Sequence, residues 1–321
     1  MDKKFLLVGF VAGLLLASTA FAQTVQSGPI HIIVPVAPAG LVDASIRTLG
    51  PKMSEALGRP VIIENRPGAG GIIGMAEVAR SRPDGHTLLF YNDGIALAPF
   101  VFANPGFDTL KDFSPITQLF SVPFGLFVHP SIPVRTLQEL VAYSKTNAGK
   151  LSAGSGGAAT GGHLFLESFK SASGADIQHI PYKGAGPALT DFIAGQTQVF
   201  AISTTLALPQ VRAGKARPLA VASAHRASNM PEVPTTAEAG YPGVEFTTWI
   251  GIFAPANMSA GLMDRIRDAA LKALNDPANL KRFADQGLDV LGTTPDEFRR
   301  FVASEHAKFG KSAAAAGIKP E

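Results

Sequence analysis

The chain has 321 residues, of which 46% are hydrophobic and only 17% charged, and its formal net charge is +3. The apolar content excludes a disordered chain, and the scattered Lys and Arg residues form no basic patch, so no nucleic acid partner is expected. Cysteine is absent, which excludes disulfides, thiolate metal sites, a cysteine nucleophile and a lipidated N-terminal cysteine.

The first 22 residues have the pattern of a signal peptide. Residues 2–4 are charged, residues 5–19 are apolar, and residues 20–22 read Ala-Phe-Ala, with small residues at the two positions that signal peptidase reads. The apolar run is shorter than the roughly 20 residues that a bilayer span needs. We therefore expect cleavage after Ala22 and export of the remaining chain to the periplasm; an uncleaved N-terminal anchor is the alternative.

Short β-branched runs alternate with helix-like segments from residue 30 onward, which is typical of a parallel sheet built from βαβ units. Strands are expected at residues 30–34, 61–64, 87–91, 151–153, 177–181, 198–202, 218–223 and 247–254. Helices are expected at residues 43–57 (ending at Gly58), at 161–169, after Pro187 as the first helical residue, at 262–274, and after capping boxes at 136–139 and 294–297.

The chain length favours two domains, yet no Ser/Gly linker marks a serial boundary. Short apolar segments near residues 122–126 and 245–249 suggest two crossings between the domains. The predicted fold class is therefore α/β, with residues 125–246 inserted as one domain between 23–124 and 247–321. Such an arrangement leaves a cleft that can close around a ligand by a hinge motion.

The loop at residues 34–43 joins the first expected strand to the first expected helix and is rich in small residues. Backbone N–H groups at a helix N-terminus favour an anion. Asp43 lies at or near the expected helix start, so it either caps the helix, contacts a ligand, or does both.

Three further glycine-rich loops follow expected strands. Residues 65–74 miss the dinucleotide-binding pattern, because position 73 is not glycine. Residues 152–163 carry Ser155 and Thr160, whose hydroxyls suit carboxylate oxygens, although a flexible surface loop is the alternative. In the fourth loop Lys183 either compensates an anionic ligand or is a solvated surface charge.

No catalytic or metal-binding constellation is found. Gly-x-Ser-x-Gly is absent, because Ser155 is preceded by Ala153, and the seven histidines show no i, i+4 pairing. His163 follows the third loop and could bind a ligand, although a packed histidine at a helix start is the preferred interpretation. Trp249, the single tryptophan, is expected to be an interdomain packing anchor rather than a face that stacks on a ligand.

Several motifs together resemble one family, the tripartite tricarboxylate transporter receptors, also known as the Bug family of periplasmic solute-binding proteins. The resemblance runs from about residue 28 to the C-terminus. The motifs are Ala39-Gly40-x-x-Asp43, Asn65-Arg-Pro-Gly-Ala-Gly-Gly71, Pro83-Asp-Gly-His-Thr-Leu88 and Pro181-Tyr-Lys-Gly184.

The resemblance implies a two-domain periplasmic-binding-protein fold of the type II kind, with a cleft for a small organic acid between the domains. The ligand would be a di- or tricarboxylate, an acidic amino acid or an aromatic carboxylate. The first loop would grip one carboxylate through backbone groups and ordered water, with the second loop nearby. The expected ligand-binding residues are Ala37, Pro38, Ala39, Gly40, Asp43, Ala69, Ser155, Gly157, Thr160, His163, Lys183 and Ser203.

The sequence departs from the family pattern at several positions. Ala39 stands where the family has glycine, Val42 replaces a usual threonine, and Ala159 replaces a usual glycine. No acidic residue lies near Ser203, which disfavours a ligand that carries an ammonium group.

The sequence therefore predicts an exported, monomeric solute-binding protein that has no catalytic residue, metal or cofactor. Its expected partners are a small organic acid and the membrane components of a secondary transporter. Two alternatives stay open. One is an exported α/β hydrolase or transferase, which needs a nucleophile and a base that the sequence does not display. The other is a ligand sensor for a signalling partner.

Overall fold

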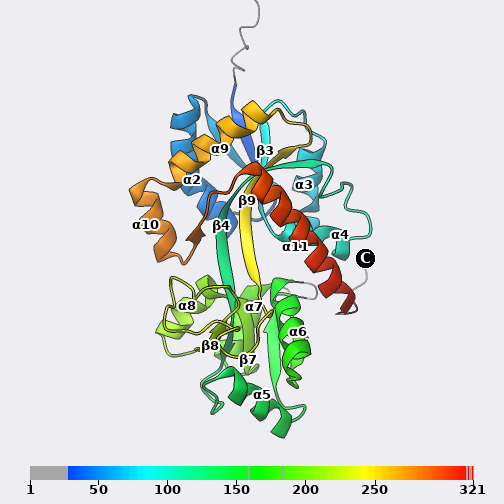
Figure 1. Cartoon of the computed structure of the whole chain (residues 1–321), viewed down its shortest axis with the longest axis vertical. Helices are drawn as coiled ribbons and strands as arrows, with labels where there is room; N and C mark the ends of the chain where they lie inside the picture. Colours follow the sequence, from blue (N-terminus) through cyan, green and yellow to red (C-terminus); the bar gives the residue numbers. More distant parts are fainter. Residues whose placement is uncertain (1–27, 158–159, 183, 316, 318–319, 321) are drawn as a thin grey trace, which may run out of the picture.

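Two long antiparallel strands, β4 (Phe113–Val128) and β9 (Thr247–Pro255), run along the middle of an elongated molecule (Figure 1). The computed structural model describes residues 28–157, 160–182, 184–315, 317 and 320. One group of strands and helices surrounds the first part of β4 and is called the upper group here, as in Figure 1. The lower group surrounds the end of β4.

The upper group is a mixed sheet with the strand order β2-β1-β3-β9-β4, and β10 pairs with β4. Strands β1, β2 and β3 are parallel, whereas β9 is antiparallel to both β3 and β4. Apart from β4 and β9, its strands are β1 (Ile30–Val34), β2 (Val61–Asn65), β3 (Thr87–Asn92) and β10 (Asp289–Val290).

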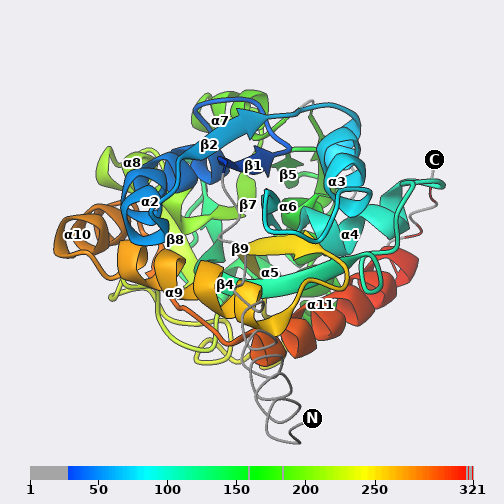
Figure 2. The ribbon, with the colours of Figure 1, turned by 90° about the horizontal axis from the view of Figure 1, so that it is seen from above.

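Helices cover both faces of the upper sheet, with α2 and α9 on one face and α3, α4 and α11 on the other (Figure 2). Side-chain alternation in β1 explains the two faces, because Ile32 packs in one core cluster with Ile46 of α2, and Ile33 packs in the other. The helices are α2 (Leu41–Leu57), α3 (Ile72–Ala79), α4 (Gly94–Val101), α9 (Ala260–Leu274), α10 (Pro277–Asp285) and α11 (Pro295–Ala315), with a 3-10 turn η1 (Ala69–Gly71) before α3.

The lower group begins where β4 leaves β9. The end of β4 pairs antiparallel with β7 and with β8, and β5 is parallel to both β7 and β6. Its strands are β5 (Ser152–Ser155), β6 (Gln178–Pro181), β7 (Val199–Ser203) and β8 (Arg217–Val221). Its helices are α5 (Leu137–Thr146), α6 (Gly161–Ser173), α7 (Ala185–Ile193) and α8 (Thr204–Arg212).

The strands cross between the groups at one place. Pro123 of β4 is the last residue paired with β9, opposite Thr247, and the next residue, Phe124, pairs with Ser203 of β7. The Phe124 N–H donates to the carbonyl of Phe246 at 3.1 Å. Both connecting segments are therefore fixed to each other at residues 123–124 and 246–247.

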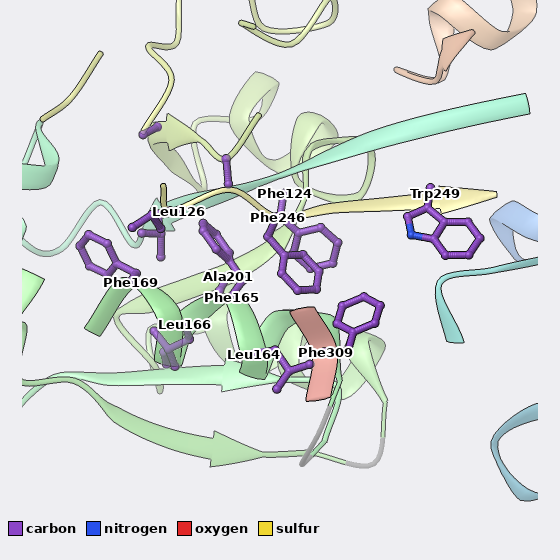
Figure 3. Close-up of a cluster of buried hydrophobic side chains, with 14 of the residues drawn as sticks. Phe124, Leu126, Leu164, Phe165, Leu166, Phe169, Ala201, Phe246, Trp249 and Phe309 are labelled. Carbon is purple, nitrogen blue, oxygen red and sulfur yellow. The ribbon is translucent and has the colours of Figure 1, made fainter. Parts of the chain in front are cut away.

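Aromatic side chains fill this crossing (Figure 3). The ring centroid of Phe246 lies 5.1 Å from that of Phe124, 6.2 Å from that of Phe165 in α6 and 6.0 Å from that of Phe309 in α11. Large apolar rings that interlock in this way stabilise both elements that they join. Phe246 thus connects the lower group to the last helix of the upper group.

Trp249 has a different role from the expected one. It is fully buried, but its ring contacts are Phe253, Phe298 and Phe301, all in the upper group, and its Nε1–H donates to Glu305 at 3.3 Å. The prediction of an interdomain anchor is wrong, because the crossing is filled by Phe246, three residues earlier in the chain.

Most expected elements are present at or near their expected bounds. Both capping boxes are confirmed: the N–H of Glu139 donates to Thr136 Oγ1 at 3.1 Å, and the N–H of Glu297 donates to Thr294 Oγ1 at 3.3 Å. Gly58 ends α2 in the left-handed conformation, as expected for a C-terminal glycine.

Two helix starts differ from the prediction. α2 begins at Leu41 with Gly40 as its N-cap, so Asp43 is the third helical residue rather than the cap. α7 begins at Ala185, which makes Pro187 its third residue and not its first. In both cases the helix begins two residues earlier than predicted, directly after a glycine that serves as the N-cap. The spacing of apolar residues did not indicate this first turn.

Within the described residues, no helix is both long and apolar enough to cross a bilayer. The expected signal peptide lies outside these residues.

Candidate functional site

The first loop, between β1 and α2, presents its backbone at the surface. Residues 37–40 are exposed, and Ala39 has a positive φ of 70°. The N–H of Ala39 donates to Asp43 Oδ2 at 2.9 Å, across the start of α2. The carboxylate of Asp43, in the first turn of α2, therefore fixes the position of the loop that precedes the helix.

Asp43 also joins this loop to the end of β2. Arg47 Nε lies 3.0 Å from both carboxylate oxygens, and Asn65 Nδ2 donates to Oδ1 at 2.9 Å and to the carbonyl of Val36 at 3.1 Å. Burial by itself would raise the pKa of Asp43, but the hydrogen bonds from Arg47, Ala39 and Asn65 outweigh it and hold the pKa below 3.8. Asp43 is 2% exposed, so its observed contacts are those of a buried anion that positions the loop.

The second loop, between β2 and α3, is built almost entirely from unusual backbone. Gly68, Gly70 and Gly71 have φ values of 127°, 62° and 95°, and exposed Ala69 has a φ of 45°. The hydroxyl of Tyr91 donates to the carbonyl of Gly70 at 3.1 Å.

The first two loops lie side by side. A Cβ atom on Gly71 would approach the carbonyl oxygen of Pro35 to 3.3 Å and Tyr91 Oη to 2.8 Å. Only Ala39, Ala69 and Asn257 have a positive φ among the described residues other than glycine. This conformation costs an L-residue about 1–2 kcal/mol. Two of the three positions that carry this strain, Ala39 and Ala69, lie in the first and second loops.

The third loop follows β5 in the lower group. Ser155 is 1% exposed, and its Oγ donates to the carbonyl of Gly157 at 2.9 Å and lies 2.6 Å from His179 Nε2. Thr160 Oγ1 also donates to the carbonyl of Gly157, at 2.9 Å. Both hydroxyls that were expected to face a carboxylate are therefore engaged within the loop and fix its shape.

His163 and His179 form a stacked pair beside this loop. Their ring centroids are 3.9 Å apart and their planes differ by 8°. Burial lowers the pKa of His179 to about 4, with a smaller contribution from a charge on His163, and burial also lowers the pKa of His163. The lowered pKa values favour the neutral form of both rings, and two neutral rings can stack closely without charge repulsion.

The fourth loop lies against the third. The N–H of Tyr182 donates to the carbonyl of Ser155 at 3.1 Å, and the N–H of Gly184 donates to the carbonyl of Gly156 at 3.0 Å. Lys183 lies outside the described residues. Ser203, at the end of β7, is 6% exposed and is the N-cap of α8, with no side-chain hydrogen bond to the helix among the described residues.

The chain matches a family of known receptors over most of its length. The family model described as "Tripartite tricarboxylate transporter family receptor" matches residues 45–318. The chain belongs to this receptor family. The resemblance stated from the sequence motifs is confirmed.

Relatives and solved structures agree with this membership. Protein BugT of Bordetella pertussis is 34% identical over 298 residues, which cover 92% of this receptor and 91% of BugT. The structure of R. palustris Rpa4515 with adipate has a TM-score of 0.79 at 31% identity and covers 91% of this receptor and 98% of that chain. MatC (Rpa3494) from Rhodopseudomonas palustris with bound malate has a TM-score of 0.75 at 28% identity and covers 89% of this receptor and 98% of MatC. The α/β fold of this receptor is therefore that of a periplasmic binding protein.

The receptor contains one pair that sequence reasoning did not find, Ser155 with His179. A hydroxyl 2.6 Å from an imidazole is the spacing of an activated nucleophile. Here the serine is buried, its hydroxyl also contacts Gly157, and no carboxylate in the described part of the chain hydrogen bonds to His179. The pair fits a structural clamp on the loop better than an acyl-transfer site. Its partners are 24 residues apart, so no local motif could have indicated it.

The described residues contain no group of three His, Cys, Asp or Glu side chains that could hold a metal ion. The loops of this receptor contain backbone N–H groups and small side chains, and they precede helix N-termini. These groups suit an anion that is held without a cluster of positive side chains.

Proposed function

We propose that this receptor captures a small organic acid in a cleft between the upper and lower groups and delivers it to the membrane components of a tripartite transporter. The observation that carries this proposal is that strands in both groups have their carboxyl ends at or near the strand crossing. In the upper group, Asn92 at the end of β3 pairs with Ile250, close to the crossing. In the lower group, Ser203 at the end of β7 pairs with Phe124, at the crossing itself.

The carboxyl ends of parallel strands lie on one edge of their sheet, and ligands of α/β proteins bind at that edge. In the upper group this edge carries the loops that follow β1, β2 and β3, and in the lower group it carries those that follow β5, β6 and β7. Two such edges that meet at one crossing can enclose a ligand from both sides. The proposed domains are residues 23–124 with 247–321 and residues 125–246, and the proposed ligand-binding residues are those named from the sequence.

A dicarboxylate is the first ligand to test, because adipate and malate are the ligands of the Rpa4515 and MatC structures. The loops before α2 and α6 place backbone N–H groups at two helix N-termini, where a carboxylate is favoured. Residues 37–40 are exposed and free of side chains larger than proline, so a carboxylate can approach their backbone.

The test is a thermal-shift screen of the purified mature protein against adipate, malate, citrate, glutamate and benzoate. A ligand at 100 times its Kd should add about 2.7 kcal/mol to the free energy of unfolding. Isothermal titration of the best acid then gives the stoichiometry, expected to be one per chain. If none of these acids stabilises the protein, the proposed ligand class is wrong.

The same sample tests the enzyme alternative. Recovery of the bound acid unchanged after long incubation is expected of a binding protein. Release of a product would instead support a hydrolase or transferase, and Ser155→Ala would then have to abolish it.

We further propose that the mature protein begins after Ala22 in the periplasm and is a monomer. N-terminal sequencing of protein from a periplasmic extract tests the cleavage, and size-exclusion chromatography with light scattering tests the mass. Uptake of the radiolabelled acid in cells that lack the receptor gene distinguishes transport from sensing, because loss of uptake is expected only for a transport receptor.

A further inference from the structure

Asp93 is a buried acid that the proposed ligand contacts leave unused. It follows β3 directly, so it lies at the same edge of the upper sheet as the first two loops. Its side chain is 7% exposed. Its N–H donates to the carbonyl of Trp249 at 3.1 Å, and its carboxylate accepts a hydrogen bond from the hydroxyl of Thr248. Asp93 is thus fixed to β9 within two residues of the strand crossing.

The residue that follows Asp93 and the second loop both lie close to the hydroxyl of Tyr91. A Cβ atom on Gly94, the next residue, would lie 2.7 Å from Tyr91 Oη, and a Cβ atom on Gly71 would lie 2.8 Å from the same oxygen. That oxygen donates to the carbonyl of Gly70. The start of α4 and the backbone of the second loop therefore both pack against the Tyr91 hydroxyl.

The surroundings of Asp93 supply little positive charge. The ionisable groups that face it are Tyr91 on its own strand and Glu305 and Lys308 on α11. Lys308 Nζ lies 3.3 Å from Glu305 Oε1, so the positive charge of Lys308 is paired with Glu305 rather than with Asp93. Within the described ranges Asp93 itself forms no ion pair. Burial, with Glu305 adding to it, raises the pKa of Asp93 to about 7.

We propose that the capture of an organic acid by this receptor is coupled to proton uptake at Asp93. This inference rests on the proposed function, since it needs an anion at the loops that follow β1 and β2. A carboxylate that binds there brings a second negative charge beside a buried acid in a region of low dielectric, where like charges repel strongly. The carboxylate of Asp93 then takes up one proton from the buffer, and no other bond is formed or broken.

Linkage fixes the direction of the effect. If the complex holds more protons than the free receptor, the affinity must fall as the pH rises through the range in which Asp93 ionises. The receptor would bind a dianion most tightly below neutral pH and release it more readily above. The Thr248 hydroxyl adjusts to either state, because it can donate to an ionised Asp93 and accept from a protonated one.

The experiment is isothermal titration of adipate and of malate at pH 7.5 in phosphate and in Tris, whose ionisation enthalpies differ. For wild type, we expect the observed enthalpy to depend on the buffer in the sense of proton uptake, and the Kd to rise about tenfold between pH 6 and pH 9. In Asp93→Asn, which is neutral at every pH, we expect no uptake at pH 7.5, no such rise, and tighter binding than wild type at pH 9.

Asp289→Asn is the matched control. Asp289 is also a partly buried acid whose pKa is raised by burial, and it hydrogen bonds to a hydroxyl, Ser228 Oγ at 2.9 Å. It lies on β10 opposite Ser121 of β4, so that β4 and β9 separate it from the carboxyl end of β3. This variant should keep the proton uptake of wild type.

The outcomes separate this inference from the proposed function. Binding without proton uptake in wild type overturns the role of Asp93 and leaves capture of an organic acid standing. Uptake that persists in Asp93→Asn also overturns it and assigns the proton to another group, such as the stacked histidines. If neither acid binds to a folded receptor, as judged by circular dichroism, the proposed ligand fails and the coupling fails with it.

Discussion

The carboxylate of Asp43 accepts a hydrogen bond from the N–H of Ala39, 2.9 Å away, and thereby fixes the loop that precedes α2. The sequence left open whether Asp43 caps the helix or contacts a ligand. In the structure the cap is Gly40, and the carboxylate is buried under Arg47 and Asn65.

Replacement of Asp43 by alanine should therefore affect both stability and binding. The change removes the acceptor of three donors, the Ala39 N–H, the Arg47 Nε–H and the Asn65 amide, so we expect a loss of about 2–3 kcal/mol in the free energy of unfolding. Affinity for the organic acid should fall several-fold because the loop is no longer positioned. Urea unfolding and isothermal titration measure the two effects.

The contribution of Asp43 also has a defined pH dependence. Its pKa is lower in the folded state than the unfolded value of about 3.8, so the stabilisation is complete above that pH and is lost as the pH falls through the folded value. The difference between wild type and Asp43→Ala should shrink below about pH 3.8. Asp264→Ala, an exposed acid on α9, is the control and should change stability little at any pH. An equally small effect of Asp43→Ala would mean that the network does not hold the loop.

The stacked histidines should give the free energy of unfolding a second pH dependence, which arises from bases that burial keeps neutral. The pKa of His179 is lower in the folded state, about 4, than in the unfolded state, about 6.5, so the unfolded chain binds more protons between these values. Stability should be complete above about pH 6.5 and decline as the pH falls toward 4. In His179→Gln this decline should be smaller, because one of the two half-buried rings no longer titrates.

Urea unfolding at pH 7, 5.5 and 4.5 measures this effect. His225→Gln replaces an exposed histidine and should follow wild type. If His179→Gln and wild type lose the same stability between pH 7 and 4.5, the stacked pair is not the group that senses acid.

Much of the fold was predictable because it depends on local chemistry. Runs of β-branched residues predicted β1, β2 and β3, and two capping boxes predicted the starts of α5 and α11. The 16-residue strand β4 was not predicted as one element. It contains two prolines and a glycine and changes partners from β9 to β7, so only tertiary pairing, with two register shifts, makes it a single strand.

The candidate site was predictable as backbone and much less as side chains. Glycine patterns located the four loops, since positive φ values need such residues. The contacts that shape those loops join residues far apart in sequence, such as Ser155 with His179 and Asp43 with Asn65. No spacing within one element encodes a pair of this kind, because the sheet order decides which strands become neighbours.

Gly71 should tolerate no side chain. Its φ is 95°, and a Cβ atom would lie 2.8 Å from Tyr91 Oη and 3.3 Å from the carbonyl of Pro35. Gly71→Ala combines backbone strain with steric overlap, so we expect a loss of more than about 2 kcal/mol in the free energy of unfolding, together with weaker binding.

Gly58→Ala provides the comparison for that variant. Gly58 also has a positive φ, 64°, but nothing lies within 4 Å of a Cβ atom there, so only the backbone strain of about 1 kcal/mol should appear. Urea unfolding of both variants measures the difference. Equal losses at the two positions would show that the second loop can move away from Tyr91.

Ala39 should be a site where glycine stabilises the protein. Its φ of 70° places an L-residue in the left-handed region, which costs about 1–2 kcal/mol, and glycine removes this strain at a smaller cost in the entropy of the unfolded chain. We expect Ala39→Gly to raise the free energy of unfolding by up to about 1 kcal/mol. Ala37→Gly is the matched control in the same exposed loop. Since Ala37 is not among the residues with a positive φ, its replacement should lower stability slightly. Urea unfolding at one pH compares the two variants, and a shift of the same sign in both would contradict strain at Ala39.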